Sequence, residues 1–190
     1  VQATSKMTNA KQTGMTAELA GREGEVLTSA PLMQLRDHAS GCGCQEGSDE
    51  SGRNYPHLVQ TFLKDVDPGA ELRIRRGEEQ VWNREAPKRQ PNITGFEAAV
   101  DGEQLFAEWH MESSSKDEPY YWIQWSADEG ESWNALASSL HGERAKLDAG
   151  TLPGGKVLLR LFGSDGFFTA VSEPTAVEVP ERPLTVSILT

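Results

Sequence analysis

Cysteine is scarce in this chain. Only two of the 190 residues are Cys, Cys42 and Cys44, so the sequence cannot build a disulfide framework. The cysteine content therefore does not determine the cellular compartment. Long apolar runs are also missing, since no stretch approaches the ~18 apolar residues that a membrane-spanning helix needs. We expect no membrane insertion.

Histidine is nearly as scarce, with four residues spread along the chain. Hydrolysis usually needs a nucleophile beside a general base. His110 falls on the outward phase of a predicted strand, and His141 precedes a Gly in a predicted turn. We therefore predict no catalytic residues, and a chain that is not itself an enzyme, with an accessory role beside an enzyme as one option.

Basic residues are depleted in the second half of the sequence. Residues 93–190 carry six Lys and Arg against sixteen Asp and Glu, and the whole chain has a formal net charge of −11. Such a field repels phosphate backbones, so we expect no nucleic-acid partner. The acidity suits cations or basic surfaces. The alternative is that the acidic residues only keep the protein soluble and prevent the edge strands from pairing with other chains.

Aromatic residues are concentrated in one stretch, residues 120–136. It holds three of the five Trp and two of the three Tyr, and it reads as two strands joined by a tight acidic turn. Tyr121, Ile123 and Trp125 share the inward phase and predict a core. The outward phase carries the candidate surface for a protein or glycan partner, namely Tyr120, Trp122 and Gln124.

Turn signals at intervals of about 8–15 residues, with period-2 alternation between them, predict an all-β fold of antiparallel β-sandwich domains, two in tandem. The Pro-rich segment 86–92 serves as the linker. We expect four parts: a flexible N-terminal segment at 1–25, an irregular β domain with a long Cys-containing loop at 26–91, a β-sandwich at 92–181, and the start of a further strand or a linker at 182–190.

The turn SADEGESW explains locally how the two aromatic strands join. Asp128 accepts from turn N–H groups, Gly130 supplies a positive φ, and Trp133 covers the base of the hairpin, with Ser126 bonding across the turn. The segment is similar to the Asp-box of sialidases and other propellers, where the box is structural. We expect a structural hairpin here, with glycan or cation contact as the alternative.

The order of the pieces between residues 92 and 180 resembles a fibronectin type III or immunoglobulin-like domain. Trp109 sits late in strand B, and residues 121–125 match strand C. Residues 147–166 resemble the passage from strand E into strand F, and residues 172–179 resemble strand G. One departure is that the Tyr that typically opens strand F is absent, and Val157 stands near that place.

This resemblance implies a non-catalytic binding or spacer module of a larger protein, secreted or at a cell surface. The alternative is a metal-binding protein that uses His38, Cys42, Cys44 and His57, which have the ligand types for zinc or copper. Their spacing does not match a standard zinc finger, so a loop without metal remains the other interpretation. Calcium binding by Asp128 and Asp165 requires that their two turns meet.

Overall fold

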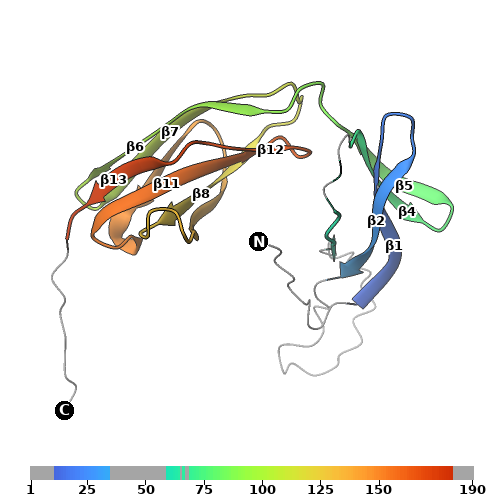
Figure 1. The fold of residues 1–190 in the computed structure, drawn as a ribbon, viewed down its shortest axis with the longest axis horizontal. Coiled ribbons are helices and arrows are strands. Elements are labelled where there is room, and N and C mark those ends of the chain that lie inside the picture. The colour runs from blue at the N-terminus through green and yellow to red at the C-terminus, as the bar shows by residue number, and fades with distance from the viewer. Residues whose placement is uncertain (1–10, 35–58, 65, 67–68, 182–190) are drawn as a thin grey trace, which may run out of the picture. The chain divides into compact units, whose positions relative to one another are not determined.

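The computed structural model describes residues 11–34, 59–64, 66 and 69–181. The chain divides into two compact units, residues 1–86 and 87–190, and the division falls inside the Pro-rich segment after the last strand of the first unit (Figure 1). Each unit is built from antiparallel strands. The described residues contain no helix that is long and apolar enough to cross a membrane.

The described part of the first unit forms one five-stranded sheet in the order β3-β2-β1-β4-β5. Its strands are β1 Lys11–Ala20, β2 Val26–Gln34, β3 Val59–Gln60, β4 Glu71–Arg76 and β5 Glu79–Glu85. β4 and β5 form a hairpin, and Gly77 in its turn has a φ of 59°. Gly suits this turn because a side chain disfavours positive φ.

β1 corrects the expectation of a flexible N-terminal segment for residues 11–20, whereas residues 1–10 lie outside the described residues. Residues 11–20 lie at the centre of the sheet, paired with β2 on one side and with β4 on the other. This strand has only two large apolar side chains, Met15 and Leu19, and its buried members are Ala17, Leu19 and Ala20. Local periodicity is therefore weak, and the strand is held by pairing with β4, which lies far along the chain.

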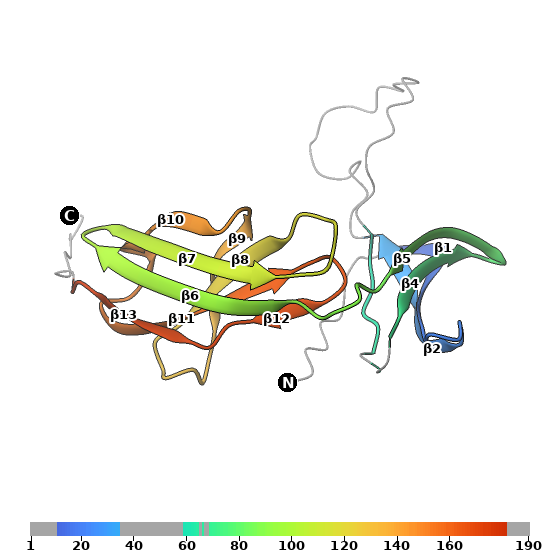
Figure 2. The ribbon, with the colours of Figure 1, turned by 90° about the horizontal axis from the view of Figure 1, so that it is seen from above.

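The second unit is a sandwich of two antiparallel sheets (Figures 1 and 2). One sheet has the order β10-β7-β6, and the other has the order β12-β11-β8-β9, with β13 also paired to β11. The strands are β6 Asn92–Asp101, β7 Gln104–Glu112, β8 Tyr120–Ser126, β9 Asn134–Leu140, β10 Arg144–Asp148, β11 Gly155–Ser164, β12 Thr169–Val171 and β13 Thr175–Val179. The predicted all-β antiparallel sandwich is confirmed.

The core of the second unit lies between these two sheets. Alternate residues of β7, β8, β11 and β13 point into it, as the period-2 patterns predicted. The buried cluster comprises Leu105, Ala107, Trp109, Met111, Tyr121, Ile123, Ala149, Leu152, Val157, Leu159, Leu161, Val177 and Val179. Burying an Ile or Leu side chain fully stabilises the fold by roughly 1.5–3 kcal/mol, so the cluster holds the sheets together.

The corner between β10 and β11 is closed without the Tyr that typically opens strand F. A short 3₁₀ turn, Ala149–Thr151, follows β10, and the carboxylate of Asp148 accepts from Gly150 N at 2.7 Å. The backbone N–H of Ala149 donates to Glu103 O at 2.9 Å. Val157 then enters β11 fully buried. An Asp cap and small apolar side chains thus secure this corner.

Candidate functional site

The turn between β8 and β9 is held by side-chain hydrogen bonds to Asp128. Ser126 Oγ donates to Asp128 Oδ1 at 2.6 Å, and Ser132 N donates to the same oxygen at 2.9 Å. Ser132 Oγ donates to Oδ2. Glu129 and Gly130 both have positive φ, 59° and 93°. The turn is therefore a compact, charged structure that fixes how the two strands meet.

These hydrogen bonds stabilise the ionised form of Asp128. Donation from Ser126, then from the Ser132 side chain and backbone, lowers the pKa of Asp128 from its ordinary value of 3.8 to about 2. A carboxylate that accepts several hydrogen bonds is more acidic because protonation would weaken them. Trp133 Nε1 donates to Gly130 O at 3.0 Å, which ties the indole to the same turn.

Three aromatic rings stack on the outer face of the β12-β11-β8-β9 sheet. Trp122 and Phe162 are directly opposite each other on β8 and β11. Their ring centroids are 5.1 Å apart, and the planes differ by 5°. Tyr120, two residues before Trp122 on β8, stacks with it at 5.9 Å and 25°. Cross-strand aromatic pairs of this kind stabilise a sheet.

Arg160 extends the row of stacked rings. Its guanidinium carbon lies 4.0 Å from the centre of the Trp133 ring and 4.9 Å from that of Phe162. Its Nε and Nη2 both donate to Gln124 Oε1, at 3.0 and 2.7 Å. Burial lowers the pKa of Arg160 from its ordinary value. The cation is nevertheless retained because guanidinium stays charged in proteins and the rings attract it.

We call the run Trp133, Arg160, Phe162, Trp122 and Tyr120 the aromatic ladder. The ladder face is the outer surface of the β12-β11-β8-β9 sheet that carries this ladder together with Gln124 and Val171. Tyr120 is 44% exposed and Val171 is 54% exposed, whereas the rest of the ladder is partly buried. The named residues of the ladder face therefore form an apolar, aromatic surface in which Arg160 is the cation.

The three outward residues proposed from the sequence lie together on this face, and β11 adds two more. Gln124 is opposite Arg160, and Trp122 is opposite Phe162. The sequence analysis did not single out Arg160 or Phe162. The signal for them was present, because they occupy the outward phase of the alternation in residues 155–164, but the pairing of β11 with β8 is not readable from the sequence.

The outer face of the opposite sheet, β10-β7-β6, has a different character. Its exposed positions on β6 and β7 include Glu97, Glu108 and Glu112. Phe106 is 42% exposed there, and Lys146 Nζ lies 5.5 Å from the centre of its ring. The two outer faces of one sandwich therefore differ, with a charged surface on one side and the ladder face on the other.

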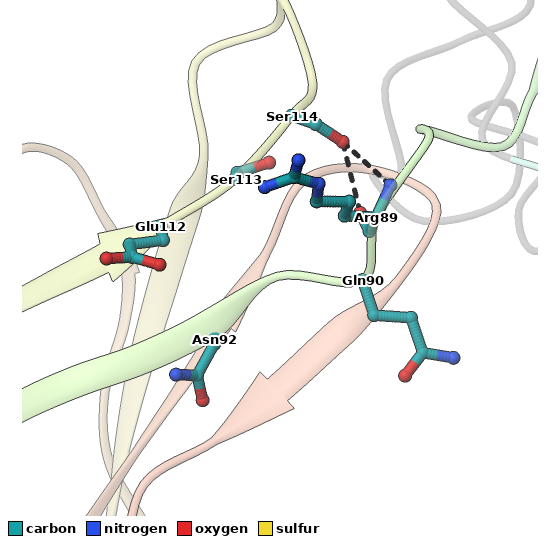
Figure 3. A pocket seen from close by; sticks show the side chains of 6 residues that line it. All are labelled: Arg89, Gln90, Asn92, Glu112, Ser113 and Ser114. Carbon is teal, nitrogen blue, oxygen red and sulfur yellow. Dashed lines mark hydrogen bonds between the residues drawn. The ribbon is translucent and has the colours of Figure 1, made fainter.

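A small polar pocket lies where the chain enters β6. Its volume is about 150 Å³, and Figure 3 shows the six lining residues, Arg89, Gln90, Asn92, Glu112, Ser113 and Ser114. Ser114 Oγ accepts from Arg89 N at 2.9 Å and donates to Arg89 O at 3.2 Å. All six residues are exposed. The pocket is therefore a surface depression that is fixed by hydrogen bonds between the Ser114 side chain and the Arg89 backbone.

A second, acidic pocket of about 330 Å³ lies between the loop after β7 and the start of β10, and Asp117, Glu118 and Glu143 are among its lining residues. The two Ser residues that line it, Ser113 and Ser115, hydrogen bond to Asp165. Ser113 Oγ donates to Asp165 Oδ2 at 3.3 Å, and Ser115 Oγ donates to Asp165 O at 3.4 Å. These hydroxyls therefore position the loop over the buried Asp165.

Both His residues of the second unit lie at the surface. His110 Nδ1 is paired with a carboxylate oxygen of Glu143, and both side chains are more than half exposed. His141 Nδ1 lies 3.7 Å from Glu118 Oε1. Each His therefore faces a carboxylate in solvent, where such pairs contribute little to stability.

The metal hypotheses have different outcomes. Asp128 follows the end of β8, and Asp165 follows the end of β11, which runs antiparallel to β8. The two turns therefore lie at opposite ends of the sheet and do not meet. In the described part of the chain, no group of three or more His, Cys, Asp and Glu is placed to hold a metal. The set His38, Cys42, Cys44 and His57 lies outside the described residues and stays a prediction.

No protein-family model and no curated protein matches the sequence. Among solved structures, a Fn3-like protein from Clostridium thermocellum matches with 18% identity over 52% of this chain and 99% of its own, at a TM-score of 0.38. A two-domain fibronectin type III segment of chicken tenascin matches with 15% identity over 89% of this chain and 85% of its own, at a TM-score of 0.36.

A third match is the FN1–FN3 region of chicken CNTN1, with 9% identity and a TM-score of 0.41; it covers 58% of this chain and 44% of that one. Similarities at this level identify no ligand and no activity. The strand order of the second unit is itself informative, since three strands, β10-β7-β6, face a sheet built on β11, β8 and β9. The second unit is an antiparallel β-sandwich of a three-stranded and a five-stranded sheet.

Proposed function

We propose that this chain is a non-catalytic β-sandwich module that binds a macromolecular partner through the ladder face. The observation that carries the proposal is the aromatic ladder itself. It places Tyr120, Trp122 and Phe162 in one stacked row beside a cation, on the outer side of a sheet. Trp, Tyr and Arg are the residues that most often dominate binding energy at interfaces.

The position of these side chains also supports binding rather than folding alone. A core has already been formed on the inner side of the same strands by Tyr121, Ile123 and Leu161, each nearly or fully buried. The ladder residues add a second aromatic layer that faces solvent. Monomeric proteins seldom leave large apolar surfaces uncovered, and such surfaces mark sites of interaction.

We place the module in a secreted or cell-surface protein, as a binding or spacer unit beside other domains. The support for this part is the resemblance of its strand pattern to fibronectin type III domains. The fold by itself does not identify an activity, since folds host many functions. The proposal therefore depends on the ladder face and is tested there.

The test is a screen of the whole chain against protein, peptide and glycan libraries, repeated with Trp122→Ala. For any specific ligand we expect the substitution to weaken binding by about 2 kcal/mol, roughly thirtyfold. Phe106→Ala is the matched control, because Phe106 is an exposed aromatic residue beside a cation on the opposite sheet. Equal losses in both variants, or turnover of a hydrolase substrate by the chain, contradict the proposal.

A further inference from the structure

We propose that the partner of the ladder face is a protein surface that is apolar at its centre and rich in Lys and Arg at its rim. In the complex, Arg160 donates hydrogen bonds to an oxygen acceptor of that partner. This inference rests on the proposed function and narrows it to one class of ligand. Three observations lead to it: the orientation of the rings, the surroundings of Arg160, and the charges at the two ends of the ladder.

The orientation of the rings favours a protein over a glycan. Sugars stack on the flat face of an aromatic ring, which must then be open to solvent. In the ladder, Trp122 and Phe162 are almost parallel at 5.1 Å, and Tyr120 stacks with Trp122. Trp122 therefore has a ring neighbour on β8 and another on β11, which limits the room for a sugar on its flat faces and leaves ring edges as part of the surface that a ligand meets. Edges carry the positive end of the ring quadrupole and suit aliphatic groups and carbonyl oxygens.

Arg160 requires an acceptor once the face is covered. None of the ion pairs among the described residues includes Arg160, and two of its N–H groups are used on the amide oxygen of Gln124. A guanidinium has five N–H donors in a planar fork. A partner that excludes water from Arg160 leaves the other donors unsatisfied unless it supplies oxygen atoms, because unpaired buried donors are costly.

The ends of the ladder are acidic. Asp117 and Glu118 precede Tyr120 at one end, while Glu129 and Glu131 lie in the turn that carries Trp133 at the other. All four are exposed. The surrounding half of the chain is also strongly acidic, with sixteen Asp and Glu against six Lys and Arg in residues 93–190. This field attracts a basic surface and repels an acidic one.

The centre and the rim together match the usual anatomy of a protein interface. Aromatic residues and Arg are enriched in the buried centre, and charged residues are placed around it, where they affect the association rate more than the affinity. A basic protein surface with apolar side chains at its middle satisfies both parts. A neutral oligosaccharide carries no positive charge to complement the acidic ends.

The experiment selects phage-displayed random peptides on the immobilised full chain, with counter-selection against Trp122→Ala. We expect enriched peptides with apolar or aromatic centres and Lys or Arg on their flanks. Synthetic copies of these peptides are then measured by surface plasmon resonance. Their association rate is expected to fall as salt is raised, because the attraction between exposed charges is screened.

Two double variants and one single variant distinguish the acidic rim of the ladder face from its centre. Glu129→Gln with Glu131→Gln is expected to slow peptide association by about threefold and to leave dissociation almost unchanged. Glu97→Gln with Glu108→Gln removes the same charge from the opposite outer face and is the control. Arg160→Lys keeps the charge without the planar fork, and we expect it to speed dissociation about tenfold. Circular dichroism establishes that each variant is folded.

The failures of the two proposals are distinguishable. If oligosaccharides on an array bind in a Trp122-dependent manner and the peptides do not, the protein partner is refuted while the binding role of the ladder face stands. Enriched peptides that are acidic, or whose association ignores both salt and the Glu129 and Glu131 substitutions, refute the basic rim. If no peptide or glycan binds in a Trp122-dependent manner, both proposals fail.

Discussion

At the scale of single residues, Gly163 shows how closely the second unit is packed. It lies on β11 directly opposite Tyr121 on β8. A Cβ atom at this position would lie 2.5 Å from Met111 Sδ and 3.0 Å from Tyr121 Cδ1. Gly is therefore required here by the closeness of two side chains in the core and not by a special backbone angle.

We expect Gly163→Ala to destabilise the second unit by about 1–3 kcal/mol, because an added methyl group overpacks the core. Gly95→Ala is the matched control. Gly95 also lies in a strand, and a Cβ there meets no atom within 4 Å. Guanidinium unfolding followed by Trp fluorescence measures both. Equal stabilities of the two variants would show that the core around Tyr121 yields without cost.

The metal hypothesis is also decided by single residues. If His38, Cys42, Cys44 and His57 form a site, protein purified without a His tag contains close to one equivalent of zinc or copper, since structural sites hold metal tightly. Metal content is measured by elemental analysis, with the variant Cys42→Ser, Cys44→Ser as the control. Less than ~0.2 equivalent in the unmodified protein rejects the site.

At the scale of elements, the turn between β8 and β9 carries a pH dependence. The folded-state pKa of Asp128, about 2, lies below its ordinary value of 3.8. A group with a depressed pKa stabilises the folded state above its unfolded-state value, and this contribution is lost as the pH falls through the folded-state value. The turn is therefore expected to weaken between about pH 4 and pH 2.

Asp128→Asn tests this expectation. The variant keeps the shape of the side chain but loses the ionised acceptor, so its melting temperature is expected to lie below that of the unmodified chain at pH 6. The gap is expected to narrow as the pH falls toward 2, where the unmodified Asp128 is itself partly protonated. Thermal melts across this range measure it, with Glu131→Gln as the control for lost charge. A gap that is independent of pH contradicts the role of the carboxylate.

Strand prediction succeeded where the sequence has strong alternation. β7, β8 and β11 carry large apolar residues at every second position, and each forms a strand with those residues inward. β1 was missed because it has only two large apolar residues, Met15 and Leu19, and because one of its two partners, β4, is distant in sequence. An alternating pattern predicts where a strand lies in the sequence, but it does not predict which other strand pairs with it.

At the scale of the whole molecule, the two units differ in their buried apolar residues and in their charge. All members of the large buried cluster belong to the second unit, which spans residues 87–190. The excess of acidic residues is also concentrated in that half of the sequence. Because the second unit has its own core, it has the attribute that defines a domain able to fold alone.

We expect a fragment of residues 87–190 to fold by itself. Its unfolding, followed by the fluorescence of its four Trp residues, is expected to match the transition of the second unit in the full chain, measured in a Trp82→Phe background so that the same four Trp report. Dispersed amide resonances in a proton–nitrogen NMR spectrum provide a second measurement. A fragment without cooperative unfolding would show that the second unit depends on residues 1–86.

The sequence by itself determined the class of fold, the hairpin at residues 120–136 and the assignment of Tyr121 and Ile123 to the core. These features follow from local rules, namely period-2 alternation and turn chemistry. Only the tertiary structure decided that β1 is a central strand and that Arg160 and Phe162 complete the ladder with Trp122 and Tyr120. Those neighbours come from distant segments, and their meeting depends on the register of β11 against β8, which no local pattern specifies.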